Sequence, residues 1–172
     1  SAPPQTAADE PYKNMLDEPM VFTGTESLPT GAAESGEIRI GLFAPDGDEH
    51  PVGRDLVRGV GLAVDRANAA GGIDGVGLRV IRRWADDPWG AGSKEVIRLV
   101  FEDRVSVVIG GPDGASTHVA QQIATKAHLP LIAPVTGDPS LTHTRVPWIF
   151  RLPPDDRVQA EVLVSEGTVP RG

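Results

Sequence analysis

The sequence predicts an α/β protein with a doubly wound parallel sheet of about five strands. Three observations lead to this fold class. From Glu37 onward, short apolar runs alternate with longer segments of helical periodicity. The run VSVVI at 105–109 is mostly β-branched, as expected for a strand covered on both faces. Glycine or proline stands at most junctions between these segments, where turns are expected.

The first 36 residues differ from the rest and predict an extended, irregular arm. They are rich in Pro, Gly, Ser, Thr and acidic residues and show little periodicity. Within them, the stretch YKNMLDEPMVFTG carries five larger apolar side chains: Tyr12, Met15, Leu16, Met20 and Phe22. Docking of this stretch on the domain and plain disorder are both compatible with the pattern.

The first half of the domain begins with a strand, EIRIGLFAP, which ends at a loop containing Pro45 and Gly47. The next segment, 52–72, places Leu56, Val60, Ala63 or Val64, and Ala67 on one helical stripe and stops at two glycines. LRVIRRW is expected to form the second strand and DDPWGAG a loop. A helix over 93–103 follows, which Ser93 could cap.

The second half repeats this alternation. VSVVIGG is the third strand, and the segment 115–128 has a helical stripe of Ala115, Val119, Ile123 and Ala127. PLIAP is the fourth strand, residues 135–147 a polar loop, and WIFRL the fifth strand. The last helix, DDRVQAEVLVSEG, has Asp155 or Asp156 as its cap. The four loops after the strands, 44–53, 86–92, 110–117 and 134–145, are therefore expected at one edge of the sheet.

The composition excludes several classes of function. The net charge is −8, from 16 basic and 24 acidic side chains, and no basic stripe is present, so nucleic acid is not expected as a partner. The absence of cysteine excludes disulfides and cysteine-type zinc sites. No apolar run approaches the roughly 20 residues that span a bilayer.

The loops offer little catalytic chemistry. GGPDGAST lacks the lysine of a Walker loop, and GLFAPDGDEHPVG lacks dinucleotide-binding spacing, so no cofactor is expected. Asp86 and Asp87 are adjacent and would point to opposite faces of a strand. His118 follows Ser116 and Thr117, but the surrounding residues do not form a nucleophile elbow. We therefore expect neither an enzyme nor a metal site.

Binding of a small anion is the better interpretation of the loop after the third strand. The backbone N–H groups of Gly114, Ala115, Ser116 and Thr117 would point out of a helix N-terminus. The hydroxyls of Ser116 and Thr117 could cap the helix or reach a ligand, and both readings stay open. Thr136 and Gly137 hold the equivalent place after the fourth strand, and Val52 and Trp89 could supply an apolar wall.

The segment IRIGLFAPDGDEHPVGRDLVRGVGLAVDRANAAGGIDG resembles the opening of type I periplasmic binding proteins of the leucine/isoleucine/valine-binding family. The resemblance continues through WADD, VSVVIGGPDGASTHVA, LPLIAPVTGDPSLT and PWIFRLPPDD, and covers residues 37–166 in the expected order. It implies a Rossmann-like lobe of a solute receptor that delivers an amino-acid-like ligand to an ABC permease. The same fold also serves ligand-sensing domains of receptors and regulators, which is the alternative function.

The resemblance also implies site residues. The family holds the ligand's carboxylate and amino group at positions that map onto Gly114 to Thr117 and onto Val135, Thr136 and Gly137. Gly114 stands where a serine is often found, Gly137 where a threonine is usual, and Val52 where an aromatic residue is common. These departures put branched-chain specificity in question.

Family members have two lobes, and this chain is short for such a protein. We expect residues 37–172 to form the first lobe, with the second lobe absent from the chain, and therefore weak or no ligand binding. Apolar surface left bare would favour self-association. A periplasmic or extracellular location is implied, with lipoprotein anchoring of the intact form as a further expectation.

Overall fold

A computed structural model describes residues 36–143 and 146–167, and it contains five parallel strands in one sheet. The strands are β1 (Ile38–Phe43), β2 (Leu78–Arg83), β3 (Val107–Gly110), β4 (Leu131–Ala133) and β5 (Ile149–Arg151). Their order across the sheet is β2-β1-β3-β4-β5, and all neighbouring pairs are parallel. The predicted α/β class and doubly wound parallel sheet are confirmed. The predicted N-terminal arm lies, apart from Gly36, outside the described residues.

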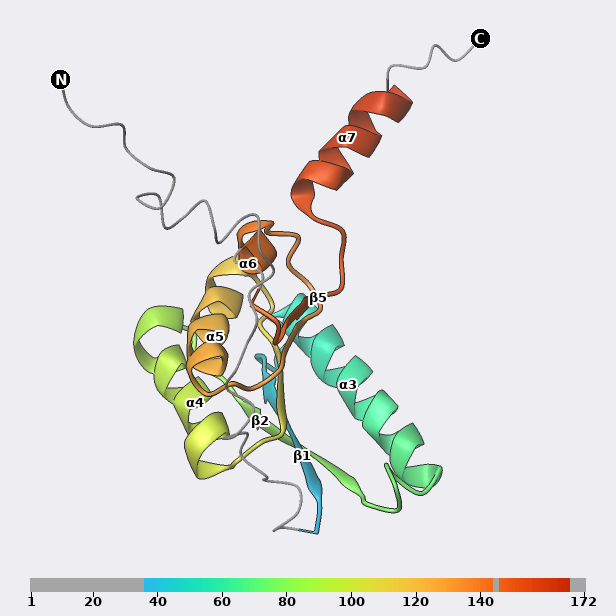
Figure 1. Cartoon of the computed structure of the whole chain (residues 1–172), viewed down its shortest axis with the longest axis vertical. Coiled ribbons are helices and arrows are strands. Elements are labelled where there is room, and N and C mark those ends of the chain that lie inside the picture. Colours follow the sequence, from blue (N-terminus) through green and yellow to red (C-terminus); the bar gives the residue numbers. More distant parts are fainter. Residues whose placement is uncertain (1–35, 144–145, 168–172) are drawn as a thin grey trace, which may run out of the picture.

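The helices lie on both faces of the sheet (Figure 1). α3 (Pro51–Ala69) is on one face. On the other lie α5 (Gly114–Lys126) and a continuous helix made of η3 (Pro88–Gly92), α4 (Ser93–Ile97) and η4 (Arg98–Glu102). The short α6 (Ser140–His143) precedes β5, and α7 (Asp156–Gly167) ends the described chain. No helix among the described residues has the length and apolarity that crossing a membrane requires.

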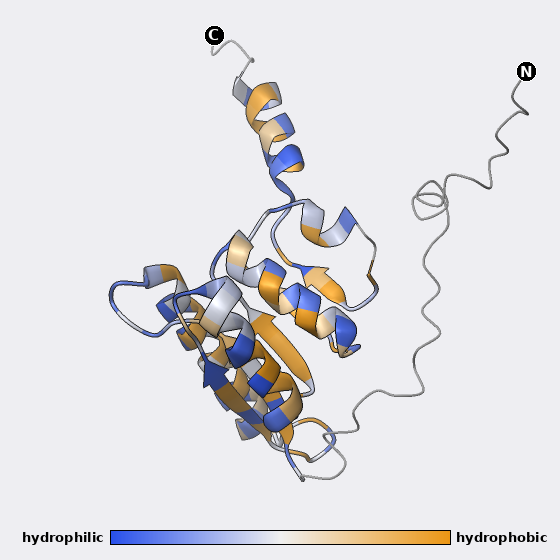
Figure 2. Cartoon of the chain, turned by 90° about the vertical axis from the view of Figure 1, so that its left-hand side faces the viewer, coloured by the Kyte–Doolittle hydropathy of each residue, from blue (hydrophilic) through white to orange (hydrophobic). Residues whose placement is uncertain are grey.

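The main core lies between the sheet and the helices of the α5 side. Phe43, Val108 and Leu131 of the strands are fully buried there against Leu99 and Ala120. Side chains alternate along a strand, so Leu42 points to the α3 side, where it is also buried. In Figure 2 the helices of the α5 side stand in front of a sheet whose strands are mostly hydrophobic.

The α3 side of the sheet is only partly covered. Paired strand residues share a face, so Leu42, Ile109, Ile132 and Phe150 form one row across four strands. Along this row the exposed fraction rises from 1% at Leu42 to 52% at Phe150. We call the β3–β5 part of this row (Ile109, Ile132, Phe150) the open sheet face.

Two helix boundaries differ from the sequence prediction. The helix predicted to begin at Ser93 already begins at Pro88, because the Gly92 N–H bonds the Asp87 carbonyl (2.7 Å) and closes a wide first turn. Ser93 is therefore not a cap, and its hydroxyl donates to the Gly90 carbonyl at 2.8 Å. α6 lies within the predicted polar loop 135–147.

Other boundaries agree with their predicted signals. α3 stops before Gly71 and Gly72, which both have positive φ. α7 begins next to Asp155, whose carboxylate accepts the Val158 N–H at 2.9 Å. α7 has no buried residue and stands away from the rest of the described chain in Figures 1 and 2.

Candidate binding site at the carboxyl edge of the sheet

The strand order reverses between β1 and β3, and the loops that follow these two strands diverge there to opposite faces. β1 is followed by α3 on one face, and β3 by α5 on the other. Such a reversal opens a crevice at the carboxyl ends of the strands. Gly110, the last residue of β3, has φ of 136°, and a side chain there would overlap the Phe43 carbonyl. Glycine at this position lets the end of β3 lie directly against the end of β1.

The turn from β3 into α5 is held by Asp113. Its carboxylate accepts the Ser116 N–H at 2.8 Å, and the Ser116 hydroxyl completes a capping box. Thr117 accepts the Gly111 N–H through its hydroxyl, and its own N–H bonds the Asp113 carbonyl. Ser116 and Thr117 are both fully buried. Of the two uses considered for these hydroxyls, the structure shows capping and support of the turn.

The backbone N–H groups at the start of α5 therefore fall into two sets, those already bonded within the turn and those that a ligand can reach. The N–H groups of Ser116 and Thr117 are bonded to Asp113. Those of Gly114 and Ala115 precede them in the first turn and are the ones in a position to meet a ligand. Gly114 is half-buried and Ala115 is exposed.

The loop after β4 lies opposite this turn. A methyl group on Gly114 would be 3.7 Å from the Thr136 hydroxyl and 3.9 Å from Asp138 Oδ2, so these residues face each other without overlap. The structure therefore brings Gly114 and Thr136 together, as the sequence predicts for the loops after adjacent strands. Val135 and Gly137 flank Thr136 and are half-buried.

Gly137 is also in contact with the segment that leads into α7. Its carbonyl accepts bonds from Arg151 Nη1 (2.9 Å) and from the Asp156 N–H (2.9 Å). A side chain at 137 would meet the ends of the flexible Asp156 and Gln159 side chains, which would have to move aside.

A hydrogen-bonded cluster ties α5 to the loop after β4. His118 Nε2 lies 3.0 Å from Asp138 Oδ2, and the Ser140 hydroxyl donates to Asp138 Oδ1 at 2.7 Å. These bonds from Ser140 and then His118 lower the pKa of Asp138 to about 2. His118 Nδ1 also lies 3.2 Å from Gln121, whose amide donates to the Leu141 carbonyl. Because both ring nitrogens have partners, His118 acts as a connection between two elements.

Two cavities open at the carboxyl edge of the sheet, near the loops after β1 and β2. One, of about 450 Å³, lies between the loop after β1 and the turn after β3 and is lined in part by Val52, Trp84 and Asp113. The other, of about 460 Å³, continues along the end of β2 and is lined by Arg82, Glu95 and their neighbours. Val52 is thus at a cavity wall, as proposed from the sequence. Trp89 is 60% exposed and is not among the residues that line either cavity.

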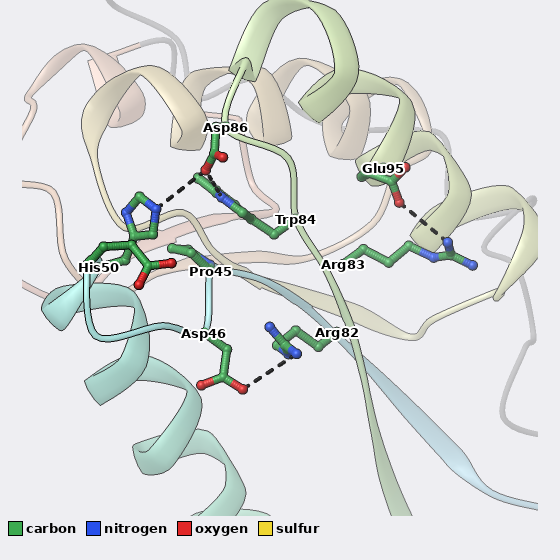
Figure 3. A pocket seen from close by; sticks show the side chains of 9 residues that line it. Pro45, Asp46, His50, Arg82, Arg83, Trp84, Asp86 and Glu95 are labelled. Carbon is green, nitrogen blue, oxygen red and sulfur yellow. Dashed lines mark hydrogen bonds and ion pairs between the residues drawn. The ribbon is translucent and has the colours of Figure 1, made fainter.

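Trp84 lines both cavities, and it was not among the site residues predicted from the sequence. Its ring packs on Phe43 with ring centres 4.8 Å apart, and its indole N–H donates to Asp86 at 2.8 Å. His50 reaches the same carboxylate at 3.5 Å, and Arg82 pairs with Asp46 at 3.5 Å (Figure 3). The sequence feature that could have identified Trp84 as a site residue is its position at the end of a strand, two residues before the Asp86–Asp87 pair.

The charges around the site are mainly carboxylates. Asp86, Asp113 and Asp138 stand close to the crevice, and among the described residues no group of three or more His, Asp or Glu side chains is arranged to hold a metal ion. Arg83 lies in the second cavity but is bound by Asp103 (Nη2 to Oδ1, 3.0 Å) and Glu95, which raise its pKa. The site therefore combines free N–H groups at a helix start with nearby carboxylates.

Comparison with known proteins agrees with this geometry. A periplasmic binding protein family model matches residues 37–166. An amino acid binding protein of Pseudomonas aeruginosa is 29% identical over 119 residues, which is 67% of this chain and 31% of that protein. A Leu/Ile/Val-binding protein homolog of Brucella melitensis is 26% identical over 152 residues, 87% of this chain and 38% of that protein.

Solved structures show the same relationship. The branched-chain amino acid transporter substrate-binding protein LivJ of Streptococcus pneumoniae, in complex with isoleucine, is 32% identical, with a TM-score of 0.64. The match covers 70% of this chain and 34% of that one. The chain therefore spans about a third of the length of the relatives it matches. With its doubly wound sheet, its crevice at the strand ends and a family match over residues 37–166, this chain belongs to the periplasmic binding protein family.

Proposed function

We propose that this chain is one lobe of an extracytoplasmic solute-binding protein that passes an amino-acid-like ligand to an ABC permease. The observation that carries the proposal is the opposition of Gly114 and Thr136 across the carboxyl edge of the sheet. The family match and the amino-acid-binding relatives support it. No described feature favours a sensor over a transport receptor.

The chemistry of this edge suits a zwitterion. The N–H groups of Gly114 and Ala115 lie at the positive end of the α5 dipole and favour a carboxylate. Asp138 Oδ2 lies near Gly114 and Asp113 adjoins it, which favours an ammonium group beside that carboxylate. An α-amino acid carries both groups on one carbon, so it fits this arrangement better than a simple anion.

The proposed site is half of a complete one. Both cavities are open to solvent, and in the proposal a second lobe closes over the ligand in the intact protein. The proposed role is binding. Ser140 Oγ lies 3.0 Å from His118 Nε2, but Asp138 Oδ2 lies at the same nitrogen and the Ser140 hydroxyl donates to Asp138 Oδ1, which is not the order of a Ser–His–Asp relay. A lipid anchor in the intact form is a further part of the proposal.

The test uses the 172-residue chain and NMR titration with L-leucine and L-isoleucine. We expect a dissociation constant on the order of millimolar, since a few backbone bonds must act without the second lobe. Amide shifts should concentrate at 113–117 and 135–137. Sub-micromolar affinity of the chain alone would contradict the half-site, and shifts confined to other segments would contradict its placement.

Two variants at Gly114 sharpen the test. Proline is accepted in the first turn of a helix, and Asp113 before it already has extended backbone angles, so Gly114→Pro removes one N–H while the cap remains. Gly114→Ser keeps the N–H and adds a hydroxyl where the structure has room. We expect the first variant to weaken binding at least threefold and the second to retain or strengthen it.

A further inference from the structure

The outer face of the helix over residues 88–102 carries large apolar side chains that no described residue covers. Trp89 is 60% exposed, Ile97 44% and Phe101 62%. The opposite face of the same helix is fully used, because Val96 and Leu99 are completely buried in the core. We call Trp89, Ile97 and Phe101 the helix stripe.

The wide turns of this helix align the stripe. In an ordinary α-helix, residues four apart are offset by about 40°, so a spacing of four drifts around the helix. Here the first and last turns close through bonds five residues apart, from Gly92 N to Asp87 O and from Asp103 N to Arg98 O. A turn closed in this way contains more residues than an α-helical turn, so residues four apart fall slightly short of a full turn. This shortfall compensates for the excess rotation in the ordinary turns. The stripe therefore follows one side of the helix for about 18 Å.

A segment of the same chain is rich in large apolar side chains. Tyr12, Leu16 and Met20 are spaced by four, and Met15 and Phe22 add two further apolar side chains. This segment lies in residues 1–35, which include one lysine and six carboxylates: Asp9, Glu10, Asp17, Glu18, Glu26 and Glu34. On the helix, Lys94 and Arg98 flank the stripe and are exposed, and Arg98 is also paired with Glu95 at 2.6 Å. An apolar segment with an excess of carboxylates therefore suits a stripe that has two cations beside it.

The position of β1 allows the segment to reach the stripe. Arg39 near the start of β1 donates to the Asp103 carbonyl at 3.0 Å, and its own carbonyl accepts the Ser106 N–H. The start of β1 is therefore in contact with the end of the helix that carries Phe101. The 13 residues between Phe22 and Gly36 can extend to about 45 Å, more than twice the length of the stripe.

We propose that residues 12–22 pack along the helix stripe of their own chain. Packing there removes Trp89, Ile97 and Phe101 from water together with the apolar side chains of the segment. Asp17 and Glu18 approach Lys94 and Arg98. The N-terminal segment then forms an additional layer on the outer surface of the α5 side, which runs from the start of β1 toward the loop after β2.

Disulfide trapping tests this placement directly, because the chain has no native cysteine. Leu16→Cys is combined in turn with Ile97→Cys, with Leu62→Cys on α3, and with Phe150→Cys on the open sheet face. The exposed fractions of the three partners are similar, at 44%, 61% and 52%. The full chain is oxidised at low concentration and analysed by non-reducing electrophoresis and peptide mass spectrometry.

We expect an intramolecular disulfide at least fivefold faster for the Ile97 pair than for the other two pairs. Adding Met20→Asp to the Leu16–Ile97 pair should slow disulfide formation. Adding 1 M salt should slow it too, but by less than Met20→Asp does. Equal rates for the three pairs, or a faster Phe150 pair, would overturn the proposal. A dimeric product of the Ile97 pair would also overturn it, since the occupant would then be a second copy.

Discussion

Asp113 determines the geometry of the turn on which the proposed site depends. Its carboxylate caps α5, and Asp113→Ala removes the acceptor of the Ser116 N–H. We expect a loss of about 1 kcal/mol in the free energy of unfolding, measured by urea denaturation. Asp113→Asn is the control, because asparagine caps a helix nearly as well. Equal losses in the two variants would show that the negative charge, rather than the cap, is what stabilises the turn.

Asp138 makes the stability of the chain depend on pH. Its folded-state pKa is lowered from 3.8 to about 2, so its contribution is present above about pH 4 and is lost as the pH falls toward 2. We expect the urea midpoint of the native sequence to fall more between pH 5 and pH 2.5 than that of Asp138→Asn. Ser140→Ala removes the largest cause and should act in the same direction.

The control for this experiment is Asp65→Asn, which removes an exposed carboxylate from α3. Because Asp155 also has a lowered pKa, some loss of stability in acid should remain in every variant. Identical pH profiles for Asp138→Asn and Asp65→Asn would contradict the role given to the His118–Asp138–Ser140 cluster.

At the scale of elements, two of the three glycines of α3 have opposite roles. A methyl group on Gly53 would lie 2.7 Å from Pro45 Cδ and 2.8 Å from the Pro45 carbonyl, so the first turn of α3 approaches the β1 loop closely. Gly59 is exposed and has open space around it. We expect Gly53→Ala to destabilise the chain by about 1–3 kcal/mol. Gly59→Ala should stabilise it by about 0.5–1 kcal/mol. Urea denaturation of both variants measures the difference, and two changes of the same sign would contradict this assignment.

At the scale of the whole molecule, the sheet has one complete layer of helices and one incomplete layer. Parallel sheets are normally covered on both faces, yet α3 leaves the open sheet face (Ile109, Ile132, Phe150) partly exposed. The relatives are about twice as long, so further segments are available there to cover it. α7 likewise has no buried residue.

We expect this surface to cause concentration-dependent self-association of the 172-residue chain. Size-exclusion chromatography with light scattering should show a rising average mass with concentration, and Phe150→Glu should reduce it. Leu62→Glu removes a similarly exposed apolar side chain from α3 and is the matched control. A constant monomer mass at high concentration, or equal effects of the two variants, would contradict the open sheet face as the cause.

The sequence by itself determined the order and type of most elements. Periodicity of apolar residues identified five strands and every helix except the short α6, and Gly71 and Gly72 marked the end of α3. Of the two caps predicted for α7, Asp155 or Asp156, the structure shows Asp155. These features depend on residues close together in the chain, whose turn chemistry and patterning are local. Because the carboxyl ends of parallel strands lie at one edge of a sheet, the alternating pattern also predicted that the loops after the strands share that edge.

Only the tertiary structure decided which groups at that edge are available. Ser116 and Thr117 are buried in the turn, Gly114 faces Thr136, Trp84 lines both cavities and Trp89 lies outside them. The wide first turn at Pro88 and the coverage of each sheet face also required the structure. The physical reason is that exposure and hydrogen-bond partners arise from contacts between segments far apart in the chain, and no local pattern encodes them.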